Sequence, residues 1–321
     1  MTAQYTPMIQ QYLAIKEQVK DAFLFFRLGD FYEMFFDDAI LAARELEITL
    51  TGRDGGGEER IPMCGVPYHS AESYIAKLIE KGYKVAICEQ VEDPKAAKGV
   101  VRREIVRIVT PGTIMETRSL EERGNNFIAG LVEEDGLCGL AVCDLSTGEL
   151  YVTSFPANIE AIADETGVYQ PREIVGSEPL LAKLKSAPAM AGRNVVYTPR
   201  ETADEAGLAS RFGERALADL IPARRRALGV LTGYLEETQR RALVHLSGFR
   251  EYEANQYMIL DQHTRRNLEL TETVHERSRR GSLLWLLDRT CTAMGARMLR
   301  RWIDKPLLSR AAIEERLDAV D

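Results

Sequence analysis

Residues 22–33, with the sequence AFLFFRLGDFYE, decide how the amino-terminal part of the chain folds. The first seven form an apolar, aromatic-rich run of strand length, and Gly29-Asp30 interrupts it. Apolar residues then recur at helical spacing through residues 35–48. A strand that leads into a helix predicts an α/β unit.

Segments on either side complete this unit. A helix is predicted to begin with Thr6 as its N-cap and Pro7 in its first turn. Pro111-Gly112 ends the last predicted strand. Between these limits the patterns predict a loop at 53–59 with three consecutive glycines, a turn at 61–69, a helix at 71–81, and strands at 83–88 and 102–109.

A second α/β domain is predicted after a polar linker at 116–126. Three strands joined by turn sequences occupy 127–132, 136–145 and 150–155, and helices and short strands then alternate, which indicates some parallel pairing. From about residue 211 the pattern is almost entirely helical, with one strand-like segment at 258–260. The sequence stops inside a helical pattern at 310–321, so we expect a fragment of a longer protein.

Composition narrows the class of protein. The 321 residues are 45% hydrophobic and 28% charged, which is typical of a globular protein. The net charge of −8 is not typical of a nucleic-acid-binding protein. No stretch resembles a membrane span or a signal peptide, so we expect a cytoplasmic protein. Five cysteines without a C-x-x-C pair are all expected to be buried thiols, and four scattered histidines predict no metal site.

Phe31 and Glu33 allow two interpretations. In the structural one, Asp30 caps a helix and Glu33, three residues on, completes a capping box. In the functional one, Phe31 projects outward at a strand-to-helix turn as an apolar wedge of the kind that minor-groove binders insert between base pairs, with the Glu33 carboxylate beside it.

Basic residues gather before and within the last strand of the first unit. Against one glutamate, Glu104, this segment carries five cations that could follow a phosphate backbone, although a solvated strand face is an equal alternative. The five are Lys95, Lys98, Arg102, Arg103 and Arg107.

Two catalytic possibilities are weighed and disfavoured. Asp144 and Glu149 flank a turn and could hold a metal ion for a nuclease, but no third and fourth carboxylate partner is evident, so a turn role for Asp144 beside Ser146 is favoured. The three glycines at 55–57 are followed by Glu-Glu-Arg, so they form no P-loop, and we expect no ATP binding by that motif.

Separated motifs in a fixed order resemble the amino-terminal part of the MutS family of bacterial DNA mismatch-recognition proteins. They span essentially the whole chain. They are TPM (6–8) with QQY (10–12), RLGDFYE (27–33), IPM (61–63) through GVPYH (65–69), AICEQ (86–90), VRIVTPGT (106–113), LD (260–261), TRRNLEL (264–270) and MLRRW (298–302).

The resemblance implies an α/β and α+β multidomain fold. Its parts would be a small mixed α/β mismatch-binding domain (1–115), a linker (116–126), a ribonuclease-H-like α/β connector (127–245) and the beginning of an all-helical core (246–321). In the family, the positions of Phe31 and Glu33 insert at the mispair, where the ring stacks on a base and the carboxylate hydrogen-bonds it.

The resemblance also implies partners and cofactors. The partners would be mismatched double-stranded DNA, MutL, and a second copy in the full-length family, with dimerisation in doubt for this chain. ATP and Mg²⁺ would belong to a carboxy-terminal ATPase that is absent here, so no cofactor and no enzymatic activity are expected. The implied location is the bacterial cytosol, in association with the nucleoid. The hypotheses are therefore a mismatch-recognition fragment, a MutL-contacting interaction module, and a metal-dependent nuclease at Asp144.

Overall fold

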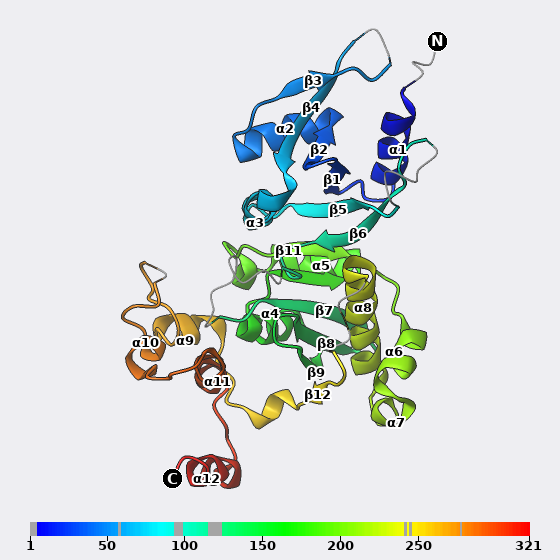
Figure 1. Cartoon of the computed structure of the whole chain (residues 1–321). Coiled ribbons are helices and arrows are strands. Elements are labelled where there is room, and N and C mark those ends of the chain that lie inside the picture. The colour runs from blue at the N-terminus through cyan, green and yellow to red at the C-terminus, as the bar shows by residue number, and fades with distance from the viewer. Residues whose placement is uncertain are drawn as a thin grey trace. The chain divides into compact units, whose positions relative to one another are not determined.

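The computed structural model describes residues 5–56, 59–92, 99–114, 124–240, 243, 246–276 and 278–321. The chain divides into unit 1, Met1–Ile114 with Leu235–Leu243, and unit 2, Met115–Tyr234 with Val244–Asp321 (Figure 1). Among the described residues no helix combines the length and the apolar character that crossing a bilayer requires.

Unit 1 is built on a mixed six-stranded sheet with the order β3-β4-β2-β1-β5-β6. Strands β1 and β5 pair in parallel, and the other neighbours pair antiparallel. The strands are β1 (Ala22–Leu28), β2 (Phe31–Phe35), β3 (Thr51–Arg53), β4 (Ile61–Pro67), β5 (Lys84–Gln90) and β6 (Arg103–Val109). The helices are α1 (Pro7–Lys16), α2 (Phe36–Leu46), the short η1 (Tyr68–Ser70) and α3 (Ala71–Glu80).

Strand β1 lies inside this sheet and is buried on both faces. Leu24 and Phe26 join a core cluster with residues of α1, β5 and β6. Because side chains alternate along a strand, Phe23 and Phe25 point to the opposite face, and both are buried as well. A continuous apolar run is what a strand covered on both sides requires, and the predicted strand at 22–28 is confirmed.

The structural interpretation of this segment, in which Asp30 caps a helix, is wrong. Residues 31–35 form strand β2, whose backbone pairs with β1 on one side and β4 on the other, and the helix begins only at Phe36. Burial in β2 alternates at its start, with Phe31 exposed, Tyr32 buried and Glu33 intermediate. The pairing on both sides outweighs the local capping signal, so Glu33 is not part of a capping box.

Strand β6 is an edge of the unit 1 sheet, and residues far along the chain bind its carbonyl groups. Arg240 Nη1 donates to Ile105 O at 2.7 Å, and Gln239 Nε2 donates to Ile108 O at 3.3 Å. Gln239 is the last residue of helix α8 (Pro222–Gln239). Unit 1 is therefore completed by a segment that lies more than a hundred residues after β6 in the sequence.

Unit 2 contains a second six-stranded sheet with the order β11-β10-β7-β8-β9-β12. Strands β7 to β9 form an antiparallel meander, β10 is parallel to β7 and β11, and β12 is parallel to β9. The meander and the parallel pairs confirm the ribonuclease-H-like arrangement expected for the second domain. The strands are β7 (Phe127–Glu134), β8 (Leu137–Asp144), β9 (Glu149–Pro156), β10 (Glu173–Gly176), β11 (Val196–Pro199) and β12 (Arg250–Glu251).

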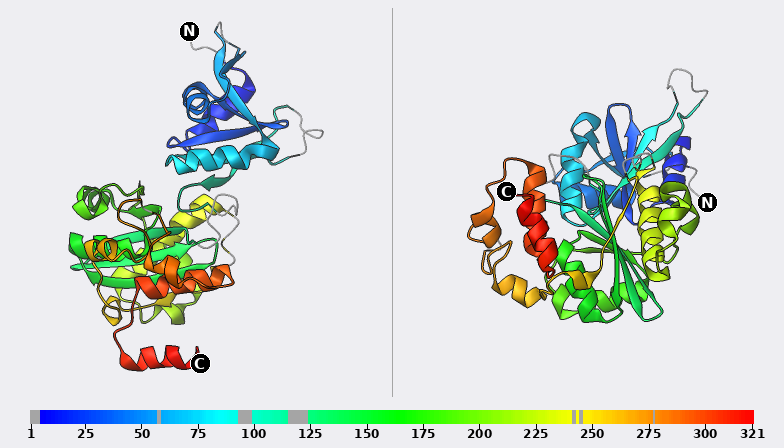
Figure 2. Two further views of the ribbon diagram at one scale, coloured as in Figure 1. Left: turned by 90° about the vertical axis from the view of Figure 1, so that its left-hand side faces the viewer. Right: turned by 90° about the horizontal axis from the view of Figure 1, so that it is seen from below.

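Helices cover both faces of this sheet. Residues of α4 (Ile159–Tyr169) and α5 (Glu178–Ser186) share an apolar cluster with the meander. Helix α8 packs closely on Gly130 and Gly139, and Figure 2 shows it in yellow-green along the sheet. At Gly139 an added Cβ would lie 2.0 Å from Ala223 O, so only glycine permits this approach.

The rest of unit 2 is mainly short helices. The predicted strand at 258–260 is wrong, since those residues form no strand and the nearby Tyr257 makes only an isolated bridge with Leu307. The prediction that all cysteines are buried is wrong for Cys291, which is exposed. The helices are α6 (Glu205–Phe212), α7 (Glu214–Leu217), η2 (Pro188–Met190), η4 (Ala254–Gln256), α9 (Gln262–Asn267), α10 (Leu283–Leu287), α11 (Ala293–Asp304) and α12 (Arg310–Asp318).

A buried lysine joins the end of α11 to α4. Lys305 Nζ lies 2.8 Å from Glu165 Oε1 and 3.7 Å from the centroid of the Tyr252 ring, and it donates to Tyr169 OH at 3.2 Å. Burial lowers the pKa of Lys305 to about 8, although Glu165 opposes the shift. The same burial raises the pKa values of Tyr169 and Tyr252 well above 10.

Candidate nucleic-acid interface

The β1–β2 hairpin presents Phe31 at its tip. Leu28 pairs with Phe31, so Gly29 and Asp30 alone make the turn, and Gly29 adopts the left-handed conformation with φ 57°. The Phe31 side chain is 46% exposed, whereas the next aromatic, Tyr32, is buried. The ring therefore stands on a strand fixed on both sides, in place of the strand-to-helix turn expected from the sequence.

Glu33 lies two residues after Phe31 and so faces the same side of the sheet. Arg53, the last residue of β3, donates from Nη1 to Glu33 Oε2 at 2.5 Å. The Glu33 side chain is 16% exposed and that of Arg53 is 38% exposed. Opposite Glu33 on β4 is Gly65, where an added Cβ would lie 3.4 Å from Glu33 Cγ.

A second exposed aromatic residue lies beside the hairpin turn. Tyr68, at the start of η1, donates its backbone N–H to Asp30 O at 2.9 Å. The guanidinium of Arg27 lies 3.6 Å from the centroid of the Tyr68 ring, and Arg27 Nε donates to Gly29 O at 2.6 Å. These contacts hold the turn that carries Phe31.

The structure separates the five basic residues that the sequence groups together. Arg103 is buried and donates to Arg27 O, Gln11 Oε1 and Val101 O, with its guanidinium over the ring of Phe26. Arg107 donates to Gln239 Oε1 and Thr113 O. Both cations bind groups within unit 1.

Arg102 differs from these two, because its side chain is 68% exposed and its ion-pair partner among the described residues is the exposed Glu104. Lys95 and Lys98 lie outside the described residues. Of the five, Arg102 is thus the one that the described structure presents to solvent.

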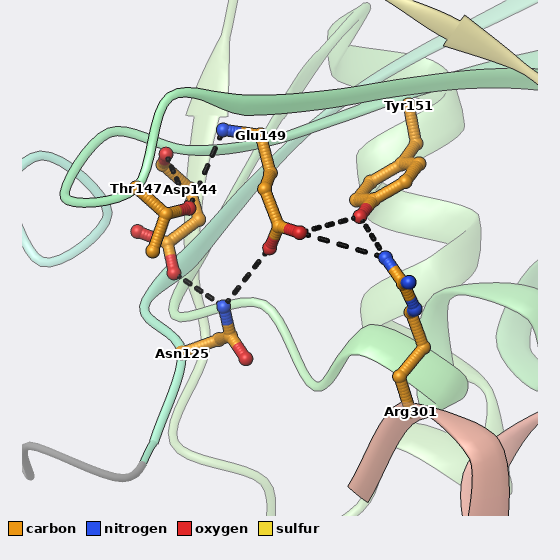
Figure 3. A network of polar contacts seen from close by, with 6 residues as sticks. All are labelled: Asn125, Asp144, Thr147, Glu149, Tyr151 and Arg301. Carbon is orange, nitrogen blue, oxygen red and sulfur yellow. Dashed lines mark hydrogen bonds and ion pairs between the residues drawn. The ribbon is translucent and has the colours of Figure 1, made fainter. Parts of the chain in front are cut away.

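Asp144 is fully buried, and its carboxylate accepts hydrogen bonds from several protein groups, of which Figure 3 shows Asn125. Oδ1 accepts from Ser146 N and Oγ at 2.9 and 2.7 Å, and Oδ2 accepts from Asn125 Nδ2 and Asn126 N at 2.6 and 3.3 Å. Such a carboxylate has its acceptor positions occupied by protein groups. This geometry is that of a turn residue.

Glu149 belongs to the same network, and its carboxylate contacts a hydroxyl group, a guanidinium and the Asn125 amide. Its Oε1 accepts from Tyr151 OH at 2.8 Å and lies 3.5 Å from Arg301 Nη1 of α11 (Figure 3). In the part of the chain that the structure describes, no three acidic, histidine or cysteine side chains are grouped as a metal site. The network links the meander to α11.

Sequence reasoning missed Arg53 and Tyr68. Arg53 stands at the start of a glycine-rich segment, which predicts only a loop, and Tyr68 lies in a Pro/Gly-rich turn. The available signal was the pair of β-forming residues Thr49 and Thr51 before Arg53, which is weak for so short a strand.

Fold and site together define a multidomain protein whose first unit displays an aromatic and an acidic side chain on one fixed hairpin. Three family models match the chain: MutS domain I over residues 6–118, MutS domain II over 126–247 and MutS domain III over 263–321. The chain belongs to the MutS family.

Individual relatives agree with the family models. The chain is 56% identical over 319 residues to the DNA mismatch repair protein MutS of Brevibacillus brevis, covering 99% of this chain and 36% of that protein. It is 54% identical over 324 residues to MutS of Bacillus cytotoxicus and 53% identical over 323 residues to MutS of Bacillus thuringiensis, in each case covering 99% of this chain and 35% of the relative. The chain therefore spans about a third of the length of these relatives.

Proposed function

We propose that the chain recognises mispaired or unpaired bases in duplex DNA and thereby takes part in starting mismatch repair. The observation that carries the proposal is the exposed ring of Phe31 at the tip of a paired hairpin, with the Glu33 carboxylate on the same face. Membership of the MutS family and the similarity to DNA mismatch repair proteins support it.

Phe31 would act as a wedge. An apolar side chain inserted at a base step has to unstack the bases, and unstacking costs least where pairing is already weak. The hairpin holds the ring in place before DNA binds, so little conformational entropy is lost on insertion. Glu33 would then accept or share a hydrogen bond with the displaced or shifted base.

Phosphate contacts would supply affinity that does not depend on sequence. Arg102, whose side chain is exposed, would make such a contact, and Lys95 and Lys98 are proposed from the sequence alone. Arg103 and Arg107 would instead stabilise unit 1, because their donors already bind acceptors there.

The remaining functional assignments rest on family membership alone. We propose MutL as a partner, and pairing into a homodimer for full-length members of the family. ATP and Mg²⁺ would bind in the part of the relatives beyond the matched third, since these 321 residues contain no P-loop sequence. The chain itself would hydrolyse no ATP.

Fluorescence anisotropy with labelled duplexes tests the proposal. Matched, G·T and single-base-loop duplexes of otherwise identical sequence are compared with the parent chain and with Phe31→Ala. Stacking contributes about 1–3 kcal/mol per base, so Phe31→Ala should weaken mismatch binding roughly 5- to 150-fold and leave matched binding unchanged.

Ile40→Ala is the matched control, because Ile40 is a similarly exposed apolar side chain of the same unit, on α2. A parent chain that binds all three duplexes equally would contradict the proposal. So would a Phe31→Ala variant that keeps the full preference for the mismatch.

A further inference from the structure

We propose that Arg53 is a specificity-determining residue that holds the Glu33 carboxylate in an ion pair until mismatched DNA binds. A mispaired base then takes the place of Arg53 as the partner of Glu33, and a DNA phosphate takes the place of Glu33 as the partner of Arg53. The inference rests on the proposed function, since it concerns how the same face of unit 1 tells mismatched from matched DNA. It starts from a difference between two neighbouring side chains: the Phe31 ring is exposed and the Glu33 carboxylate is already bound.

The pair is placed to be exchanged rather than to be permanent. Arg53 lies at the end of the short strand β3 and is the more exposed member, so its guanidinium can be reached by a phosphate. Arginine binds phosphate oxygens with the same planar donor set that it offers a carboxylate. Phosphate is thus a direct competitor of Glu33 for Arg53.

The carboxylate can leave Arg53 only if another donor replaces it. Glu33 is largely buried, and an ionised carboxylate without a partner at the surface of DNA would meet the negative charge of the phosphates. A mispaired or extruded base offers a hydrogen bond at this position, whereas a base in an intact pair does not. Exchange is therefore favourable with a mismatch and unfavourable with matched DNA.

The exchange has a measurable consequence in salt dependence. On mismatched DNA the chain makes one more phosphate contact than on matched DNA, so the two log–log salt slopes differ by about 0.9. Between about 50 and 200 mM KCl, the preference for a G·T duplex over its matched counterpart should then fall about three- to fourfold in the parent chain.

Two variants of the ion pair should remove this slope difference in opposite ways. In Arg53→Met neither duplex gains the extra contact, so the slope for G·T DNA falls to that for matched DNA. In Glu33→Gln no ion pair holds the arginine, so its guanidinium contacts a phosphate of matched DNA as well. Matched DNA should then bind about two- to fivefold more tightly, and its salt slope should increase to that of G·T DNA.

Arg44→Met is the control, because Arg44 pairs with a glutamate, Glu45, in the same unit and carries the same charge. It should leave the slope difference intact. Thermal unfolding of each variant identifies any loss of fold, and because the two test variants act in opposite directions, either one alone decides the question.

The outcomes separate this inference from the function on which it rests. A parent chain without any preference for G·T DNA refutes both. A parent that prefers G·T DNA with equal slopes for the two duplexes overturns the exchange and leaves the wedge in place, and a guanidinium that bridges Glu33 and a phosphate would give that result. An unchanged slope difference in Arg53→Met also overturns it.

Discussion

Replacement of Lys305 by methionine should change how the stability of unit 2 depends on pH. The side chain is 8% exposed, its amine lies against the Tyr252 ring and pairs with Glu165, and the pKa of the amine falls from 10.5 to about 8 on folding. Between these two values the unfolded chain binds a proton that the folded chain does not. The free energy of unfolding of the parent therefore rises with pH from 8 to 10.5 through this group.

The size of the effect follows from the difference of the two pKa values. The shift of 10.5 − 8 = 2.5 corresponds to a total on the order of 3 kcal/mol, of which roughly 2 kcal/mol should be gained between pH 7 and pH 10. Lys305→Met has no such proton. The parent should thus gain about 2 kcal/mol over the variant across this range, whatever the difference between them at pH 7.

Tryptophan fluorescence during urea unfolding measures this quantity for unit 2 alone, because the two tryptophans of the chain, Trp285 and Trp302, both lie in it. Tyr169 and Tyr252, whose pKa values burial raises, lower the stability only above about pH 10 and do so in both proteins. Lys183→Met, at a lysine that is 65% exposed, is the control. A difference between parent and Lys305→Met that stays constant from pH 7 to 10 would refute the reasoning.

Three further predictions concern buried groups. Asp144→Asn should destabilise unit 2 by about 1–3 kcal/mol, since an amide nitrogen would face donors such as Asn125 and Ser146. The parent should show no Mg²⁺-dependent nicking of plasmid DNA, and nicking that Asp144→Asn abolishes would restore the nuclease hypothesis. Gly139→Ala should destabilise unit 2 by more than about 2 kcal/mol, because the added Cβ would overlap the backbone of α8. Gly136→Ala has open space around the added atom and should be destabilised less, only by the cost of a left-handed alanine, so equal urea midpoints for the two variants would count against this packing. A thiol reagent at pH 8 should label Cys291 in the folded chain and the other four cysteines only after unfolding, since these four are buried and burial raises the pKa of Cys88 and Cys138 to about 12. Mass spectrometry that detects rapid labelling of several thiols in the folded chain would contradict the burial pattern.

Much of the fold could be predicted where a residue pattern had one structural solution. The apolar run at β1, the proline that starts α1 and the turn sequences of the meander each determine an element locally. Strand β2 could not be predicted in this way. Its capping-box pattern is a helix signal, and only pairing with β1 and β4, which are distant interactions, makes it a strand.

For the candidate site, the sequence singles out Phe31 and Glu33, whose roles stay predictions, but it does not give the ion-pair partner of Glu33. Phe31 and Glu33 follow from the sequence together with the family resemblance, yet the partner of Glu33 comes from another strand across β4. A count of charges along the sequence places Arg103 and Arg107 in one group with Arg102. In the structure, the side chains of Arg103 and Arg107 bind acceptors inside unit 1, because side-chain direction alternates along β6. Side-chain direction depends on tertiary neighbours, which a charge count does not include.

The late completion of unit 1 has a consequence for biosynthesis. Two carbonyl groups of edge strand β6 accept hydrogen bonds from Gln239 and Arg240, which the ribosome adds more than a hundred residues after β6 itself. At about 5–20 residues per second, the nascent first sheet spends several seconds or more with this edge uncovered. An uncovered edge strand can pair with another chain, so translation speed through the second sheet sets how long a newborn molecule is open to aggregation.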